Sequence, residues 1–526
     1  MKPILEQPRN VFTSAEADES RLLVDASDYY CSVYRALEQA QHYAVLSGWQ
    51  FDSGVALLRG RDAELAQRPV TLLRFLSTLC EERPSLSIYL LAWDYSVVYA
   101  QEREWMQGLK FAFSTNPRVR FEWDDHPVIG ASHHQKFVVV DGAVGFLGGI
   151  DICDARWDDC RHESANPNRV NLGGEPCKPY HDVQAALTGP AVAPLIELFG
   201  ERWQRATGDR LYLDAPSPET RARFDLSTLC GNQGEDIGAR RVSFSRTQQD
   251  PRANPVEVSE IRQLFTDAIW AAERMIYAET QYFTSRSIAS VLVDRLRDEQ
   301  LPKLDIVICM PHGSDSPMEK LALGDTQEEV LFVVQETARQ HGHALSLIYP
   351  VTQDALGVET PIFIHAKLLI VDDQLLMVGS PNLTERSMGL DSEIAVSWQC
   401  SSDDEDQAAR HCLRNVRTRL LAEHSGLPAA DFELERGLAV QVEAIVDGGK
   451  SGLRRRAVTS SGPLGPLMAR IFDPADGILA DVPPNGSEAG LGSGEREHWF
   501  ASGIQGLAQR LHRARSKPTA QTPKAR

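Results

Sequence analysis

Apolar residues along the chain alternate between a helical and a strand-like period. Positions from about 21 to 42 repeat their apolar residues at helical spacing, and the aliphatic run at about 43 to 49 predicts a strand directly after that helix. Further helices are predicted at 70–80, 99–109, 257–273, 286–299 and 326–341, and further strands at 86–91, near 119, up to 278, at 304–310 and at 344–349. This order predicts α/β layers built on mixed sheets.

Two aliphatic runs carry the same polar motif, a His-x-Lys couple with an Asp seven residues after the His. The motif residues are His134, Lys136 and Asp141 in the first copy, and His365, Lys367 and Asp372 in the second. Each run ends in a turn sequence, which predicts a strand, a tight turn and a second strand. Because alternate residues of a strand share a face, each His lies beside its Lys. The Asp has the opposite parity, so we expect it to brace the turn rather than to touch substrate.

The spacing of the copies indicates an internal repeat. Subtracting 134 from 365 gives 231, and the same offset aligns Gly149 with Ser380 and Asp151 with Asn382. We therefore predict a first repeat at 21–215 and a second at 216–427. The flanking regions are predicted as an N-terminal extension at 1–20, a C-terminal extension at 428–512 and a basic disordered tail at 513–526. Within the C-terminal extension, the sequence predicts a strand at 438–446, a linker at 483–495 and a short helix at 498–511.

Composition narrows the class of protein. The 526 residues are 42% apolar and 24% charged, enough for a large core. No apolar run approaches the roughly 20 residues of a membrane span, and no secretory core follows Met1, so we expect a cytoplasmic or peripheral membrane protein, with leaderless export left open. The net charge of -19 argues against a general nucleic-acid surface. The nine cysteines are scattered without metal-ligand spacing, so neither a disulfide framework nor a zinc site is expected.

From about residue 20 to 425 the sequence resembles the phospholipase D superfamily. Besides the two motifs, five blocks are similar to its lipid-cleaving branch: 148–151, 156–159, 180–183, 189–192 and 279–283. The resemblance implies two pseudo-twofold related α/β/α domains with mixed sheets and one active site at their interface. One departure is Thr280, where the family usually has Asn.

The residue types suit phosphodiester chemistry. Two Lys and two His around one phosphate can neutralise its charge without a metal or other cofactor. One imidazole must be neutral to attack phosphorus, and the other must be protonated to donate to the leaving oxygen. Symmetry leaves open which is which; the resemblance implies that His134 attacks, that His365 protonates, and that a covalent phosphohistidine forms.

A histidine in either role needs an acceptor at its second ring nitrogen. The resemblance places acidic orienting residues in the two runs that Asp182 and Glu393 open. We expect Asp182 to orient His134 and Glu393 to orient His365. The first half holds 20 more residues than the second between Asp151 and Asp182, which predicts a loop near the site.

Further residues are candidates for substrate binding. Small residues such as Gly148, Gly149 and Gly379 would let backbone or short polar donors approach the phosphate. The predicted substrate-binding set is Gly149, Asp151, Ser380, Asn382, Gln281 and Trp157. Trp157 has a competing interpretation as a core aromatic. His133 points to the opposite face of the predicted strand from His134 and Lys136, so we interpret it as a structural residue.

These observations predict a phospholipase D that hydrolyses the distal phosphodiester of glycerophospholipids, with transfer to alcohols. Alternatives are a cardiolipin synthase-like phosphatidyltransferase, a nuclease or other phosphodiesterase, and a non-catalytic lipid-binding module. The expected partners are a phospholipid surface and water or a small alcohol as acceptor. We expect no nucleic acid, and a monomer.

Overall fold

The structure is a computed structural model. It describes residues 3–94, 110–111, 116–128, 130–231, 234–250, 257–313, 317–400, 406–434 and 436–458. The helix predicted at 99–109, the linker at 483–495, the helix at 498–511 and the tail at 513–526 lie outside these ranges. Among the described helices, none combines the length and apolar character needed to cross a bilayer.

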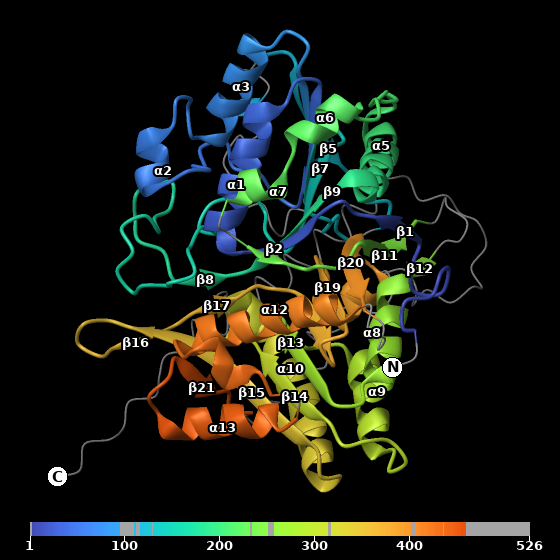
Figure 1. Cartoon of the computed structure of the whole chain (residues 1–526), viewed down its shortest axis with the longest axis vertical. Helices are drawn as coiled ribbons and strands as arrows, with labels where there is room; N and C mark the ends of the chain where they lie inside the picture. Colours follow the sequence, from blue (N-terminus) through green and yellow to red (C-terminus); the bar gives the residue numbers. More distant parts are fainter. Residues whose placement is uncertain are drawn as a thin grey trace, which may run out of the picture. The chain divides into compact units, whose positions relative to one another are not determined.

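The first half of the chain builds an eight-stranded mixed sheet (Figure 1). Its strand order is β10 (Glu235–Asp236), β2 (Ser20–Val24), β9 (Val183–Thr188), β7 (Val144–Gly148), β6 (Phe137–Val140), β3 (Tyr43–Gly48), β4 (Ser87–Trp93), β5 (Val119–Asp124). Its helices are α1 (Asp25–Gln39), α2 (Gly60–Leu65), α3 (Leu72–Glu82), α5 (Ala193–Thr207), α6 (Pro218–Arg223) and α7 (Leu226–Cys230). The apolar faces of α1 and α3 pack on one side of the sheet, and that of α5 packs on the other.

The second half repeats this plan around an eleven-stranded sheet. Its main order is β1 (Thr13–Glu16), β11 (Arg241–Gln249), β20 (Glu393–Gln399), β19 (Leu375–Gly379), β18 (Leu368–Val371), β13 (Met275–Glu279), β14 (Asp305–Cys309), β15 (Ala344–Gln353), β16 (Glu359–Pro361), with β12 (Glu257–Ser259) on β11 and β21 (Leu453–Arg455) on β15. Its helices are α8 (Glu260–Ala271), α9 (Arg286–Arg297), α10 (Pro317–Gln340), α11 (Glu385–Gly389), α12 (Gln407–Ser425) and α13 (Leu438–Gly448). Two α/β/α halves with mixed sheets result, as predicted.

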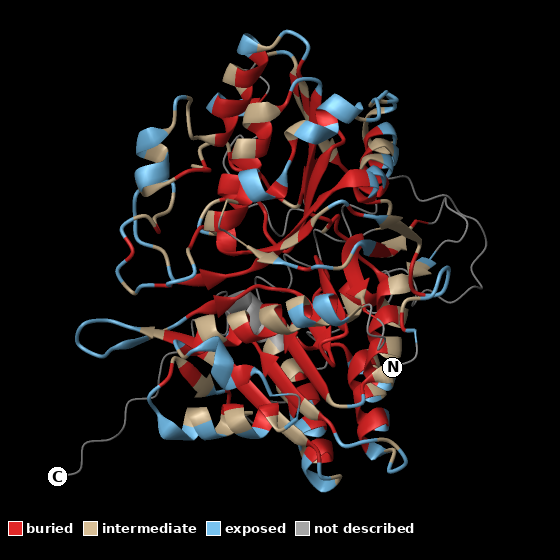
Figure 2. Cartoon of the chain, viewed as in Figure 1, coloured by how far each residue is buried: buried red, intermediate tan, exposed pale blue. Residues whose placement is uncertain are grey.

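One apolar core joins the two halves. The same buried cluster contains Val139 and Trp203 from the first half and Val396 and Leu420 from the second. Figure 2 shows the central strands of both sheets mostly in the colour of buried residues. The face on which the halves meet is therefore packed like a protein interior, which fixes the side chains that it carries.

The halves also exchange strands at their edges. β1, from the N-terminal segment, pairs antiparallel with β11 in the sheet of the second half. In return, β10 follows the first half in sequence and pairs with β2 in the sheet of that half. Each sheet is thus completed by residues that lie outside the compact stretch forming the rest of it.

Several elements differ from their predicted bounds. The helix expected at 21–42 begins at Asp25, because the apolar residues just before it lie in β2 and Asp25 has a φ of 63°. The prediction of a strand at 438–446 is wrong: this segment is α13, which buries Leu438, Ala439 and Val442 at helical spacing. Gly437 and Gly449, both with positive φ, bound that helix.

Asp141 and Asp372 occupy equivalent positions at the hairpin turns. The Asp141 carboxylate accepts hydrogen bonds from the backbone N–H groups of residues 41, 42 and 43, at 2.8–2.9 Å. The Asp372 carboxylate does the same for residues 273, 274 and 275, at 2.7–2.8 Å. Each carboxylate therefore ties a hairpin turn to the start of the neighbouring strand, β3 or β13. The His of each motif lies before β6 or β18 and the Asp lies after it, so the two residues are at opposite ends of that strand.

Candidate active site

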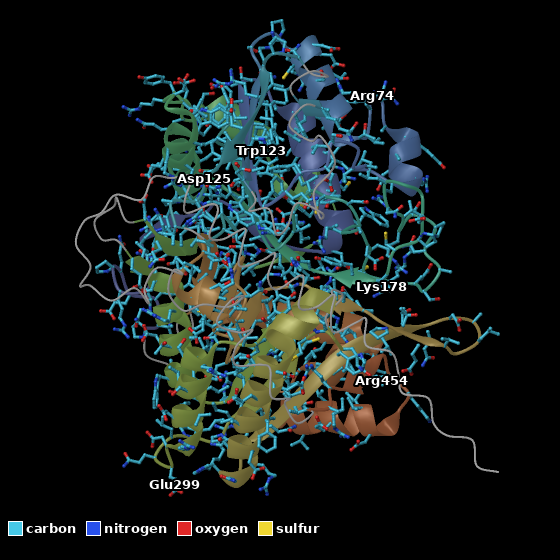
Figure 3. All side chains as sticks on the ribbon, turned by 180° about the vertical axis from the view of Figure 1, so that it is seen from behind. Arg74, Trp123, Asp125, Lys178, Glu299 and Arg454 are labelled. Atoms are coloured by element: carbon cyan, nitrogen blue, oxygen red, sulfur yellow. The ribbon has the colours of Figure 1, made fainter. Side chains whose placement is uncertain are left out.

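The two His-x-Lys couples lie just before β6 and β18, on the face where the halves meet. A two-stranded parallel ladder of β8 (Tyr180–His181) and β17 (Phe363–Ile364) crosses from one half to the other. In Figure 3, Lys178, two residues before β8, marks this level of the molecule from behind. A second crossing is an isolated parallel bridge between His133 and Ser392. Backbone pairing, rather than side chains alone, brings the motifs together.

Each imidazole of the two motifs is held by a carboxylate from the opposite half. His134 Nδ1 lies 3.0 and 3.1 Å from the two carboxylate oxygens of Glu393. His365 Nδ1 lies 2.5 Å from Asp182 Oδ2. The predicted orienting residues are therefore the right ones, but the predicted pairing of Asp182 with His134 and of Glu393 with His365 is wrong.

The register of the two crossings explains this exchange. In the β8–β17 ladder His181 pairs with Ile364, so the next residues along the two strands, Asp182 and His365, are neighbours. The bridge from His133 to Ser392 places the residues after them side by side in the same way. Sequence reasoning treated each motif within its own half, and a parallel pairing between halves has no local sequence pattern.

Each lysine donates to the backbone oxygen of the histidine in its own motif and lies beside a polar side chain of the site. Lys136 Nζ donates to the backbone oxygen of His134 at 3.0 Å and lies 3.3 Å from Asp151 Oδ2. Lys367 Nζ donates to the backbone oxygen of His365 and, at 3.2 Å, to Gln281 Oε1. Both ammonium groups are buried. Lys136 thus faces a carboxylate, whereas Lys367 faces a neutral amide.

Burial and neighbouring charges shift the pKa of His365 and of three charged groups around the two imidazoles. Burial, reinforced by the cations of Lys367 and Arg156, holds the pKa of His365 well below its ordinary value. Burial also raises the pKa of its partner Asp182 to about 6 and lowers the pKa of Lys367 to about 7. Burial would raise the pKa of Glu393 as well, but His134 and two hydroxyl hydrogen bonds hold it below its usual range.

Gly149 and Ser380 lie against the carboxylates of Asp182 and Glu393, and neither leaves space for a phosphate beside it. A Cβ on Gly149 would lie 2.4 Å from Asp182 Oδ1. Ser380 Oγ donates to Glu393 Oε2, and the backbone N–H of Ser380 donates to the Ile394 oxygen. The backbone N–H of Gly149 is likewise bonded, to the oxygen of Val183. The expected phosphate contacts of Gly149 and Ser380 therefore have no free donor, and both residues act on the carboxylates that hold the histidines.

The other predicted substrate residues divide between site and core. Asp151 and Gln281 contact the two lysines directly. Asn382 is buried with its Oδ1 lacking a hydrogen-bond partner, so it remains a prediction for substrate binding. Trp157 packs in the apolar core of the first half, with the Arg59 guanidinium 5.1 Å from its ring centroid. That placement agrees with its interpretation as a core aromatic.

Three contributors were missed by the motif analysis. The Arg156 guanidinium lies 5.1 Å from the ring centroid of Tyr180, whose ring centroid is in turn 5.4 Å from that of His365. Ser387 Oγ donates to Glu393 Oε1 at 2.7 Å. The Arg156 and Tyr180 blocks were visible in the sequence, but their contact needs the fold of the loop at 152–181. Ser387 gave no signal of its own.

Among the described residues, two overlapping groups could hold a metal ion, and neither includes a residue of the two His-x-Lys couples. One consists of Asp25, His162, His181 and Glu423. Its members are far apart in sequence, so ligand spacing could not find them.

A duplicated α/β fold with two facing His-x-Lys couples is the architecture of phospholipase D-like proteins. The sequence matches the family model described as phospholipase D over residues 36–307, more than half of the chain, and the model described as cardiolipin synthase, PLD-like domain, over residues 265–413. The chain belongs to the phospholipase D superfamily.

Its curated relatives are distant. It is 23% identical to phospholipase D alpha 4 of Arabidopsis thaliana, over 76% of this chain and 64% of that protein. It is 25% identical to phospholipase D A of Dictyostelium discoideum, over 77% of this chain and 35% of that protein. The chain thus spans less than two thirds of either relative. The structure of phosphatidylserine synthase from Haemophilus influenzae Rd KW20 matches the fold with a TM-score of 0.50 at 14% identity, covering 79% of this chain and 89% of that one.

Proposed function

We propose that this protein is a phospholipase D that hydrolyses the distal phosphodiester of glycerophospholipids to phosphatidate and a free head group. The observation that carries the proposal is the pair of histidines, each with Nδ1 bonded to a buried carboxylate and each beside a buried lysine. Nδ1–H donation leaves Nε2 as the reactive atom on both rings. The relatives named phospholipase D support the lipid substrate.

In the proposed reaction, the two ammonium groups and Arg156 stabilise the charge of the phosphate oxygens. One imidazole Nε2 forms a bond to phosphorus while the bond to the head-group oxygen breaks, and the other imidazole gives that oxygen a proton. Water then attacks the phosphorus of the phosphohistidine and gives its proton to the second imidazole. The bond between phosphorus and the first imidazole breaks, which releases phosphatidate and restores the free histidine. A small alcohol can replace water in the second step.

We propose that His365 is the nucleophile, the reverse of the order that the resemblance implies. A nucleophile must be neutral, and the lowered pKa of His365 keeps its imidazole neutral near neutral pH. His134 is the other motif imidazole, and its Nδ1 lies 3.0 and 3.1 Å from the two carboxylate oxygens of Glu393, which leaves its Nε2 to face the substrate. His134 is then the proton donor to the leaving head group.

The second candidate is a phosphatidyltransferase, favoured by the match of residues 265–413 to the cardiolipin synthase-like model. Both reactions share the first step and differ in the acceptor. Phosphatidylcholine and phosphatidylethanolamine vesicles should therefore be assayed with water alone, with ethanol or glycerol, and with a second phospholipid as acceptor. A single-stranded DNA digest tests the nuclease alternative.

We expect head-group release in water and diversion to a phosphatidyl alcohol as alcohol is added. Release only with a lipid alcohol would identify the transferase instead, and DNA cleavage without lipid cleavage would contradict both. His365→Ala should abolish release, whereas His343→Gln is a matched control, because His343 is buried in the second half and bonded to Leu304 and Leu296, away from the site.

A further inference from the structure

A buried group of imidazoles and carboxylates lies beside the active site without belonging to it. Four residues converge: Asp25 at the start of α1, His162 from the loop before β8, His181 on β8, and Glu423 on α12. Three come from the first half and Glu423 from the second. Their candidate ligand atoms all lie within 4.8 Å of one another.

The contacts between these imidazoles and carboxylates have the length expected between neighbouring zinc ligands. His162 Nε2 lies 3.4 Å from Asp25 Oδ2 and 3.4 Å from Glu423 Oε1. His181 Nδ1 lies 3.2 Å from Asp25 Oδ1 and 3.0 Å from Glu423 Oε1. Zinc bonds of about 2.0 Å to nitrogen and oxygen place neighbouring tetrahedral ligands about 3.3 Å apart. The distances from Glu423 Oε1 to both imidazoles, and from one Asp25 oxygen to each imidazole, are close to this value.

Two of these atoms make ion-pair contacts within the group but no hydrogen bond. His181 Nδ1 and Asp25 Oδ2 are fully buried, and within the part of the chain that the structure describes neither makes a hydrogen bond of acceptable geometry. Buried polar atoms are almost always hydrogen-bonded, so two such atoms without a hydrogen bond in one group of possible metal ligands need an explanation. A cation bound by the group satisfies both.

The surroundings are those of a metal-bound histidine. The second nitrogen of His162 lies 2.9 Å from Asp158 Oδ2, and Arg169 donates to the other oxygen of Asp158. The second nitrogen of His181 lies 2.9 Å from Glu279 Oε2. Carboxylates in this position fix the tautomer and orientation of zinc-bound imidazoles.

The other carboxylate oxygen of Glu279 also has hydrogen-bond partners. His424 Nε2 lies 2.9 Å from Glu279 Oε1, which also accepts from the Tyr277 hydroxyl. A cavity of about 340 Å³, lined among others by His162, Glu423 and His424, leads to the group and offers a path for an ion.

We infer that Asp25, His162, His181 and Glu423 bind a zinc ion that joins the two halves of the protein. Two carboxylates balance the charge of Zn²⁺, and two imidazoles complete four ligands without an open position, as in structural zinc sites. The ion would fix β8 against α12. Because Asp182 follows His181 directly, it would also hold the carboxylate that orients His365. The inference concerns the metal alone and stands or falls independently of the proposed reaction.

The direct test is the metal content of the full chain. The protein is produced without a polyhistidine tag in zinc-supplemented medium, dialysed against metal-free buffer and analysed by inductively coupled plasma mass spectrometry. We expect one zinc per chain, and X-ray absorption should give nitrogen and oxygen ligands at about 2.0 Å with scattering from two imidazoles. His162→Gln and Asp25→Asn should lose the zinc, whereas the buried-histidine control His343→Gln should keep it.

A second variant guards against misfolding. Asp158→Asn leaves the four ligands in place but alters the partner of His162, so it should weaken zinc binding about 10- to 100-fold in competition with a chromophoric chelator. A wild-type chain that takes up no zinc in culture or on reconstitution, with an unchanged unfolding temperature, overturns the inference in favour of a metal-free ionic cluster. Zinc retained in full by both His162→Gln and Asp25→Asn overturns it as well.

Discussion

The pair His134–Glu393 and the pair His365–Asp182 come from the same repeated motif, yet their surroundings differ. The His134 side chain is 18% exposed and its carboxylate partner receives the hydroxyls of Ser380 and Ser387. The His365 side chain is 10% exposed and lies among cations, with a partner whose pKa is raised. Internal symmetry supplied two equal imidazoles, and burial and local charge made them unequal. An acid–base division therefore needs no difference within the motifs themselves.

The strongest test of this comparison is removal of each histidine in turn. With an activated aryl phosphodiester, whose leaving group needs little protonation, His134→Ala should retain measurable turnover, whereas His365→Ala should lose it. General acid catalysis is typically worth about 10² to 10⁴ in rate, so the contrast should be large. Peptide mapping of the trapped intermediate at alkaline pH should find phosphohistidine at 365. A phosphoryl group at position 134 would reverse the assignment and leave the family membership intact.

The crossed pairing predicts which substitutions act together. Asp182→Asn and Glu393→Gln should each lower kcat about 10- to 100-fold, as loss of an orienting partner does at other histidine sites. In the His134→Ala background, with the activated substrate, Glu393→Gln should add little further loss, while Asp182→Asn should retain its full effect. Equal additional losses from both substitutions would contradict the crossed arrangement.

Lys367 should give the pH profile of the reaction an alkaline limb. The pKa of Lys367 is lowered to about 7 by burial, so its ammonium is present below that pH and lost above it. The value of kcat/KM should accordingly fall as pH rises through about 7. Gln281→Glu would set a carboxylate beside Lys367 Nζ and should move this limb upward by about 1 to 3 pH units. Tyr282→Phe, which alters the same hydrogen-bond chain without adding charge, is the control; an unmoved limb in Gln281→Glu would exclude Lys367 as its origin.

The turn carboxylates should affect stability and leave chemistry unchanged. Asp141→Ala and Asp372→Ala each leave three backbone N–H groups without their acceptor. Since a hydrogen bond to a charged group contributes about 1.5–3 kcal/mol, each substitution should lower the free energy of unfolding by at least that amount, measured by urea denaturation. The kcat at a temperature where the variant is folded should stay at the wild-type value. A large fall in kcat without loss of stability would indicate contact with substrate.

Local periodicity was sufficient for most of the fold. The strands β3, β4, β13 and β14 and the helices α3, α8 and α9 lie close to their predicted ranges, because each has an apolar pattern of one clear period. At 438–446, apolar residues are too continuous to separate the two periods, and the glycines that bound the helix were the better guide. Leu22 and Leu23 were assigned to the helix that follows them because a short strand has little pattern of its own.

The site was predictable as a set of residues and not as a geometry. The two histidines, two lysines and two carboxylates could all be named from the repeat and the resemblance. Which carboxylate serves which histidine depends on the parallel pairing of Tyr180–His181 with Phe363–Ile364, residues about 180 positions apart in the chain. The loop at 152–181, with Arg156 and His162, likewise has irregular backbone whose contacts no period describes.

The exchange of edge strands has a consequence for synthesis. Thr13 pairs with Phe244, so β1 leaves the ribosome before the partner strand exists. Subtracting 13 from 244 gives 231 residues, and at about 5–20 residues per second the nascent segment waits on the order of ten seconds or more. During that time the sheet of the second half does not exist, and β1 presents an unpaired edge open to wrong partners. A chaperone that shields the first twenty residues would therefore improve the yield of folded chain more than one that acts after termination.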